Sequence, residues 1–256
     1  MWDFDKIKKY WEKRAKDDNS KQSTTNDVYL REIEARALGD FIIKLAPKRI
    51  ADFGCGDGCT TITTASKLSS AKFSGFDYSD SMILNANNNL SKTNLDNVTF
   101  KIGDITSPIN DSFDLIYTTR CLINITNIDL QYKAILNIHS SLLKDGYFIM
   151  IENFIEGQNN FNELRKAYGL PSIPIREHNL FFTRDDLMQS IKDIFKIEYE
   201  INISSTYYMM SRIIYSKLCV DSCSAPDYYN EHHRYASTLP FSGEYGPLRL
   251  LVLKKK

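Results

Sequence analysis

The chain lacks the features that would place it outside the ordinary folded proteins. Its five cysteines are an odd number at irregular spacing, which does not describe a disulfide scaffold. It has no excess of one charge, since it contains 32 basic and 32 acidic residues. It therefore lacks the net positive charge that is typical of proteins that bind nucleic acid. It also has no apolar run of membrane-spanning length, and its first residues hold acids rather than an export signal. These absences predict a reduced, cytoplasmic protein without a nucleic-acid or membrane partner, and they leave its oligomeric state open.

What is present is an alternation of short apolar segments with amphipathic ones. Leu38, Phe41, Ile42 and Leu45 follow a helical spacing that Pro47 ends, and a second helix is expected over 129–143. Strands are expected at 49–53, 72–77, 98–102, 113–118, 147–152, 194–203 and 248–254. This order predicts a doubly wound α/β fold with a seven-stranded, mostly parallel sheet.

The pattern predicts one domain, 1–256, with four parts. We expect an N-terminal helical arm over 1–30, a ligand-binding core over 31–154, a cap or substrate region over 155–247 and a last strand over 248–256. The cap has little periodicity over 155–184, and its tyrosine-rich stretch 205–245 is a long excursion, which is usually functional. The tyrosines at 207, 208, 228, 229, 235 and 245 either line a pocket or pack on one another.

A glycine-rich loop follows the first predicted strand. In Asp52-Phe53-Gly54-Cys55-Gly56-Asp57-Gly58, three glycines fall within five residues, where the backbone can turn sharply and approach a ligand closely. A dinucleotide-binding loop places its third glycine one residue later, at the position of Cys59. No phosphate-binding Gly-Lys-Ser/Thr is present, so a nucleoside-triphosphate loop is excluded as well. A purely structural turn is the other interpretation of this loop.

The loop and the segments after it resemble the class I S-adenosylmethionine-dependent methyltransferases, over roughly residues 33–153. The matching motifs are Phe76-Asp77-Tyr78-Ser79-Asp80-Ser81-Met82 after the second strand, Ile102-Gly103-Asp104-Ile105 after the third, Phe113-Asp114-Leu115-Ile116-Tyr117 in the fourth, and Leu142-Leu143-Lys144-Asp145-Gly146 before the fifth. The resemblance implies a Rossmann-like methyltransferase fold and S-adenosyl-L-methionine as the cofactor.

The resemblance also implies a role for each matching position. Residues Asp52, Gly54, Cys55 and Gly56 would shape the methionine pocket, Asp77 would bind the ribose hydroxyls, Tyr78 and Met82 would flank the adenine, and Asp104 with Ile105 would hold its edge. Arg120 would contact the cofactor from below, and Arg31 is a candidate for its carboxylate, because a guanidinium matches that group. Asp77 could instead cap the next helix, and Arg31 could be a solvated side chain.

A hydroxyl acceptor needs a general base, and the chain has only four histidines. We predict His178, in the lid after the fifth strand, as the base, and Glu152 as an orienting acid or second base. His232 and His233 are the next choice, whereas His139 lies on an apolar helix face. A metal site is not expected, because the spacing of Cys219 and Cys223 from the adjacent histidines is not that of a zinc finger or ribbon.

The last prediction concerns the methyl acceptor. A second, less specific resemblance is to methyltransferases of bacterial capsular-polysaccharide clusters, carried by Arg120-Cys121-Leu122-Ile123-Asn124, by His178-Asn179 and by the terminal strand after Gly246-Pro247-Leu248. It implies a small soluble acceptor, with O-methylation of a sugar or sugar nucleotide of a surface polysaccharide. N-methylation of an amine or RNA base, and cofactor binding without turnover, are the alternatives. Cys121 as a nucleophile toward a pyrimidine is a poor match, and a buried thiol is the default.

Overall fold

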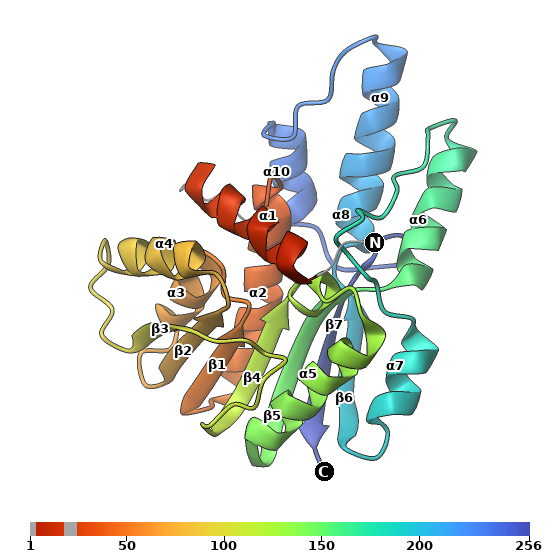
Figure 1. Cartoon of the computed structure of the whole chain (residues 1–256). Helices are drawn as coiled ribbons and strands as arrows, with labels where there is room; N and C mark the ends of the chain where they lie inside the picture. The colour runs from red at the N-terminus through yellow and green to blue at the C-terminus, as the bar shows by residue number, and fades with distance from the viewer. Residues whose placement is uncertain (1–3, 18–24) are drawn as a thin grey trace.

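Seven strands form one sheet in the computed structural model, which describes residues 4–17 and 25–256. The strands are β1 (Arg49–Phe53), β2 (Lys72–Asp77), β3 (Val98–Ile102), β4 (Phe113–Thr119), β5 (Leu142–Asn153), β6 (Phe195–Asn202) and β7 (Leu248–Lys255). Their order across the sheet is β3-β2-β1-β4-β5-β7-β6, and β7 is antiparallel to both of its neighbours while the remaining pairs are parallel (Figure 1). The order reverses between β1 and β4, which is where open α/β sheets bind ligands at the carboxyl ends of the strands.

Helices cover both faces of the sheet. On one face α2 (Val28–Leu45), α3 (Cys59–Ala65) and α4 (Asp80–Leu90) enclose a core that includes Leu38, Ile42 and Ala86. On the other, α5 (Ile128–Ser141) and α7 (Arg184–Ile191) enclose a second core with Ile138 and Leu187. Burial on both faces explains why the strands read as apolar runs in the sequence.

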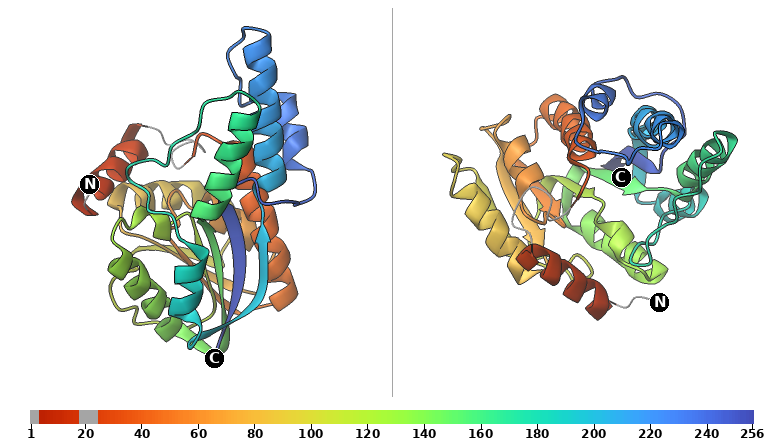
Figure 2. Two further views of the ribbon diagram at one scale, coloured as in Figure 1. Left: turned by 90° about the vertical axis from the view of Figure 1, so that its right-hand side faces the viewer. Right: turned by 90° about the horizontal axis from the view of Figure 1, so that it is seen from above.

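The remaining helices stand above the carboxyl ends of the parallel strands (Figures 1 and 2). They are α1 (Phe4–Asp17), the short η1 (Leu122–Asn124), α6 (Ile155–Ala167), α8 (Ser205–Tyr208), the π-helix η2 (Met209–Ile214), α9 (Tyr215–Asp221) and α10 (Glu231–Ser237). Seen from above, α1 lies beside α4, while α10 lies beside α2 on the other side (Figure 2). Within the described ranges, no helix has the length and apolar character needed to cross a membrane.

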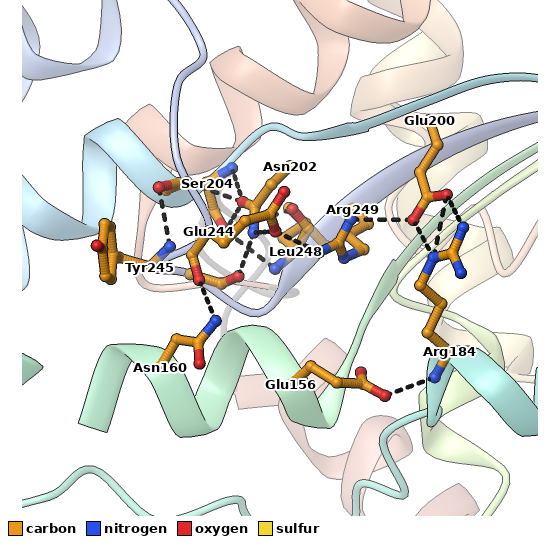
Figure 3. A network of polar contacts seen from close by, with 12 residues as sticks. Glu156, Asn160, Arg184, Glu200, Asn202, Ser204, Glu244, Tyr245, Leu248 and Arg249 are labelled. Atoms are coloured by element: carbon orange, nitrogen blue, oxygen red, sulfur yellow. Dashed lines mark hydrogen bonds and ion pairs between the residues drawn. The ribbon is translucent and has the colours of Figure 1, made fainter. Parts of the chain in front are cut away.

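A polar network fixes this cap to the edge of the sheet (Figure 3). Glu200 on β6 accepts hydrogen bonds from the guanidinium groups of Arg184 and Arg249, each with a closest approach of 2.8–2.9 Å. Glu156 on α6 accepts the backbone N–H of Arg184 at 2.8 Å, so α6 is tied to the start of α7. The cap is therefore held to β6 and β7 by charge-assisted bonds rather than by apolar packing alone.

The predicted fold and its seven strands are confirmed, with two corrections of detail. The helix expected over 129–143 ends at Ser141, because β5 starts at Leu142 and takes in the turn at Asp145, whose φ is +61°. The stretch 155–184, expected to be irregular, begins with the regular helix α6. Its buried face holds Gln158 and Arg165 beside Phe161, so it gives little apolar periodicity. Of the predicted arm, residues 1–3 and 18–24 lie outside the described part of the chain.

Candidate functional site

A cavity of about 500 Å³ opens at the carboxyl ends of the strands, at the point where the strand order reverses. Ten of the predicted site residues line it: Arg31, Asp52, Gly54, Cys55, Gly56, Asp77, Tyr78, Met82, Arg120 and His178. Its volume lies within the usual range of 300–1,000 Å³ for small-molecule sites. Glu152, Asp104 and Ile105 are not part of its wall.

The glycine loop takes a conformation that side chains would obstruct. The φ angles of Gly54, Gly56 and Gly58 are +77°, +53° and +73°, in the left-handed region that favours glycine. A Cβ at Gly54 would also lie 2.4 Å from the Sγ of Cys121. The backbone N–H groups of Gly54 and Cys55 donate to the Phe76 carbonyl at 2.8 and 3.0 Å, which joins the loop to the end of β2. These hydrogen bonds hold the loop in place, with Gly54 and Gly56 in the cavity wall.

Asp77 stands at the end of β2, next to this loop. Its carboxylate accepts the N–H of Gly56 at 3.0 Å and that of Ser79 at 2.9 Å, and burial raises its pKa to about 6 against these two bonds. The cap of α4 is a different residue, Ser79, whose hydroxyl accepts the N–H of Met82 at 3.1 Å. Since Asp77 is not needed as the cap and lines the cavity, its carboxylate can accept from hydroxyl groups of a ligand.

Asp52 is the second carboxylate of this half of the cavity. It is almost fully buried at the end of β1 and accepts the Thr61 hydroxyl at 2.6 Å. Burial raises its pKa to about 7, with the hydroxyls of Thr61 and Tyr117 opposing the shift. A cationic ligand group beside Asp52 and Asp77 would favour their charged forms.

Replacing Asp77 by asparagine is expected to weaken binding of S-adenosylhomocysteine by about 1.5–3 kcal/mol, because a charged acceptor of hydroxyl bonds is lost. Isothermal calorimetry measures this directly. Asp80→Asn is the matched control, since Asp80 is exposed in the first turn of α4, and it should bind like the wild type. Equal affinity of the Asp77 variant and this control would show that Asp77 does not bind the ligand.

The N-cap and the first turns of α2 carry three charged residues, of which the sequence analysis named only Arg31. Asp27, Arg31 and Glu34 follow one another at helical spacing and line the cavity. Each is paired with an opposite charge from another element: Asp27 with Arg212 of η2, Arg31 with Asp57 of the glycine loop at 3.1 Å, and Glu34 with Arg120 at 2.6 Å. The acid–base–acid spacing along α2 is the signal that sequence reasoning passed over.

These pairs change what was expected of the two arginines. Arg31 does line the cavity, but its guanidinium forms a two-pronged contact with Asp57. Arg120 adopts a left-handed φ of +50° and reaches Glu34. Burial raises the pKa of Glu34, with Arg120 opposing. Both arginines are thus engaged with protein carboxylates, and their contact with a cofactor stays a prediction.

His178 lies in the loop between α6 and α7 and lines the cavity, as the sequence predicted for an acceptor-binding residue. Its ring is buried and stacks on Tyr10 of α1, with 4.7 Å between the ring centroids, and its edge meets Trp11. Burial lowers its pKa, and the positive charges of Arg176 and Arg14 lower it further. A neutral imidazole at neutral pH is the form that can accept a proton.

The other histidines lie away from the cavity wall. His139 on α5 meets Phe195 edge-on at 5.3 Å, as expected of a residue on an apolar helix face. His233 is buried against Tyr215 and Tyr228, and burial with the nearby Arg212 lowers its pKa to about 4. Of the tyrosines considered in the sequence, Tyr208 and Tyr228 line the cavity. Among the residues that the structure describes, no cluster of three or more potential metal ligands occurs.

Glu152 is not part of the cavity wall, and its role as a second base stays a prediction. Its fully buried carboxylate accepts three backbone N–H groups at the start of η1, those of Cys121 and Leu122 at 3.0 Å and that of Ile123 at 3.3 Å. Both carboxylate oxygens therefore fix the backbone of the turn after β4. This arrangement favours the other part of the prediction, an orienting acid, acting through the loop that carries Cys121.

Burial raises the pKa of Glu152 from 4.5 to about 7, while the three N–H donors oppose the shift. Because the folded protein binds this proton more tightly than the unfolded chain, the contribution of Glu152 to stability falls as pH rises through this window. The wild type should lose about 3 kcal/mol of unfolding free energy relative to Glu152→Gln between pH 4.5 and 7. Denaturant unfolding of both proteins across this range measures the difference. A wild type that gains unfolding free energy relative to Glu152→Gln as the pH rises would mean that the N–H donors outweigh burial.

Asp104, which the resemblance assigns to the edge of the adenine, does not line the cavity either. Asp104 follows β3, and its Oδ1 accepts both the N–H and the hydroxyl of Thr106 at 2.8 Å. The side chain of Ile105 is buried in the core between the sheet and α5. Local turn formation and core packing account for both residues, so their adenine contact remains only a prediction from the resemblance.

Comparisons with known proteins identify the class to which this architecture is similar. A family model described as a methyltransferase domain matches residues 46–169, which includes the glycine loop, Asp77 and Glu152. No curated protein matches the chain by sequence.

Solved structures resemble nearly the whole chain. Magnesium protoporphyrin IX methyltransferase from Synechocystis PCC 6803, with S-adenosylhomocysteine bound, superposes with a TM-score of 0.62 at 15% identity, covering 96% of this chain and 94% of that one. The N-methyltransferase NodS from Bradyrhizobium japonicum WM9, also in complex with S-adenosylhomocysteine, gives 0.57 at 10% identity, covering 97% and 98%. An S-adenosylmethionine-dependent methyltransferase from Clostridium acetobutylicum ATCC 824 gives 0.58 at 14%, covering 87% and 91%. The chain therefore has the fold of S-adenosylmethionine-dependent methyltransferases, and the capsular-polysaccharide resemblance is not part of these findings.

Proposed function

We propose that the protein transfers the methyl group of S-adenosyl-L-methionine to a small soluble acceptor. The observation that carries the proposal is that one cavity joins two unlike walls. One wall is the glycine loop with Asp52 and Asp77, and the other is formed by α2, α6, η2 and the loop with His178. When bound, the cofactor would supply the methyl group that is transferred.

The residues of the first wall fit the cofactor. The glycine loop offers backbone without Cβ atoms, Asp77 offers a carboxylate for two neighbouring hydroxyls, and Tyr78 and Met82 offer flat or apolar surface for a base. Asp52 would lie on the side of the cationic methionine part. In-line methyl transfer depends mainly on alignment and exclusion of water, so holding both reactants in one cavity would supply much of the catalysis.

The second wall supports a ring-containing acceptor with hydroxyl groups. The aromatic residues Tyr208, Tyr228 and Phe161 and the amide residues Gln158 and Asn179 are part of this wall. We propose His178 as the base that accepts the acceptor's proton. O-methylation of a sugar or sugar nucleotide, as in surface-polysaccharide precursors, is the acceptor class that we propose on this basis and on the sequence resemblance.

Incubation with labelled methyl donor and separate panels of sugar nucleotides, amines and RNA, followed by mass spectrometry and NMR of the products, tests the proposal. Methylation of a sugar hydroxyl is the expected result. Methylation of an amine or RNA base would keep the class and reject the acceptor. Cofactor binding without turnover on any panel would favour a non-catalytic binding protein.

A further inference from the structure

The buried face of α6 carries two polar side chains. Gln158 and Arg165 lie on this face on either side of Phe161, and all three are buried. Arg165 donates to the backbone carbonyl of Pro171 at 2.7 Å and to that of Arg212. Its guanidinium therefore holds the loop after α6 and the π-helix η2 of the cap. Gln158 is the polar member of this face that lines the cavity.

The carboxamide of Gln158 has one end occupied and one end open. Its Nε2 donates to the backbone carbonyl of Ile173 at 2.7 Å, and because only the amide nitrogen can donate, this bond fixes the orientation of the group. Within the described ranges its Oε1 accepts no hydrogen bond, and this oxygen is not enclosed by protein atoms. Since Gln158 is 6% exposed and lines the cavity, a ligand in the cavity can donate a hydrogen bond to Oε1.

Tyr208 brings a second open polar group to the same part of the cavity wall. α8 stands beside α6 (Figure 1), and the ring of Tyr208 meets that of Phe161 edge-on, with 5.2 Å between the centroids. Phe161 lies one turn after Gln158, and side chains at this spacing are neighbours on a helix. In residues 4–17 and 25–256 the hydroxyl of Tyr208 has no hydrogen-bond partner, and it is not enclosed either. Burial raises the pKa of Tyr208, with the charge of Arg212 opposing, so the phenol keeps its proton and can donate.

We infer that Gln158 and Tyr208 together bind a hydroxyl group of the methyl acceptor, other than the one that is methylated. A hydroxyl group can donate to Oε1 of Gln158 while it accepts from the phenol of Tyr208. A carboxylate would leave Oε1 without a donor, and an ammonium group would leave the phenol proton without an acceptor. The inference rests on the proposed function, which assigns this wall to the acceptor. It narrows the acceptor to a compound with at least two hydroxyl groups, such as a sugar ring.

Binding of methyl glycosides tests the inference without requiring turnover. The full-length protein, saturated with S-adenosylhomocysteine, is titrated with the methyl glycosides of D-glucose, D-galactose and D-mannose and with their monodeoxy analogues, by saturation-transfer difference NMR. The wild type should bind one glycoside about two- to tenfold more tightly than the analogue that lacks one particular hydroxyl, because one hydrogen-bonded group is lost. Gln158→Leu and Tyr208→Phe should each abolish this preference for the same hydroxyl. Binding of no glycoside, or a preference that survives in both variants, overturns the inference.

Asn162→Leu is the matched control for the structural role of Gln158. Asn162 also bonds Ile173, donating to its carbonyl at 3.1 Å and accepting its N–H at 2.9 Å, but it does not line the cavity. This control should therefore keep the preference, although it removes two bonds to the loop where Gln158→Leu removes one. Tyr208→Phe keeps the ring against Phe161, so it tests the hydroxyl without disturbing the packing. Loss of the preference in Asn162→Leu as well would assign it to the anchoring of Ile173 and overturn the role of Gln158.

The two proposals can fail separately, because each titration is repeated without S-adenosylhomocysteine and the binding of S-adenosylhomocysteine is measured by calorimetry. Its affinity should be unchanged in Gln158→Leu and Tyr208→Phe. If S-adenosylhomocysteine binds but no glycoside preference depends on these two residues, the hydroxyl site is rejected and methyl transfer stands. If the preference depends on them while S-adenosylhomocysteine does not bind, the hydroxyl site stands and the proposed methyl transfer is rejected.

Discussion

Replacement of His178 by alanine is expected to lower turnover by about 10²–10⁴-fold, with little change in affinity for S-adenosylhomocysteine. The imidazole is buried in the cavity wall, and this burial, with the positive charges of Arg176 and Arg14, lowers its pKa, so that at neutral pH it is neutral and able to accept a proton. Because its pKa is lowered from 6.5, the wild-type rate should rise with pH below that value and reach a plateau above it. The variant should lose this acidic limb of the pH profile.

The contact of His178 with Tyr10 and Trp11 calls for a second variant. His178→Phe keeps an aromatic ring against α1 but has no nitrogen to accept a proton, so it should be as inactive as the alanine variant while preserving the packing of the arm. His139→Ala is the control and should keep wild-type turnover, because His139 packs edge-on against Phe195 and does not line the cavity. An active phenylalanine variant would show that His178 only packs against the arm.

Replacement of Gly54 by alanine is expected to reduce the free energy of unfolding by about 2–5 kcal/mol. A φ of +77° costs an alanine about 1–2 kcal/mol, and the contact of its Cβ with Cys121 adds an overpacking cost of about 1–3 kcal/mol. Denaturant unfolding measures the total. The same change should also weaken cofactor binding, because the loop of Gly54 forms the cavity wall.

A second glycine separates the two costs. Gly169 has a φ of +68°, and a Cβ there would meet no atom within 4 Å, so Gly169→Ala should show the backbone cost alone. Combining Gly54→Ala with Cys121→Gly removes the clashing thiol and should give a favourable coupling free energy in a double-mutant cycle. Equal destabilisation by Gly54→Ala and Gly169→Ala would contradict the contact with Cys121.

The sequence predicts what depends on local patterns. Apolar runs ending at Phe53 and Asp77 mark strand ends correctly, because parallel strands buried on both faces leave a clear signal. The glycine loop and Asp77 follow from the same strand ends. These elements alone bring most of the predicted residues to the cavity.

The sequence does not reveal which charges pair across the fold. From the sequence, the guanidinium of Arg31 is predicted to be available for a ligand. In the structure it forms an ion pair with Asp57, and this pairing depends on how α2 packs against the glycine loop. Glu152 reads as an acid at a strand end, as Asp77 does, but the turn of η1 folds back and covers it with N–H donors. The same strand-end position therefore holds a cavity carboxylate in one strand and a buried structural one in another.

The most direct test of the account is calorimetric titration of the protein with S-adenosylhomocysteine. We predict saturable binding at one site per chain, weakened in Asp77→Asn and unchanged in Asp80→Asn. Saturation at about 100 times the dissociation constant should also stabilise the folded protein by about 2.7 kcal/mol. Absence of binding heat and of stabilisation with both S-adenosylmethionine and S-adenosylhomocysteine, or binding of a nicotinamide dinucleotide that depends on Asp77, would contradict it.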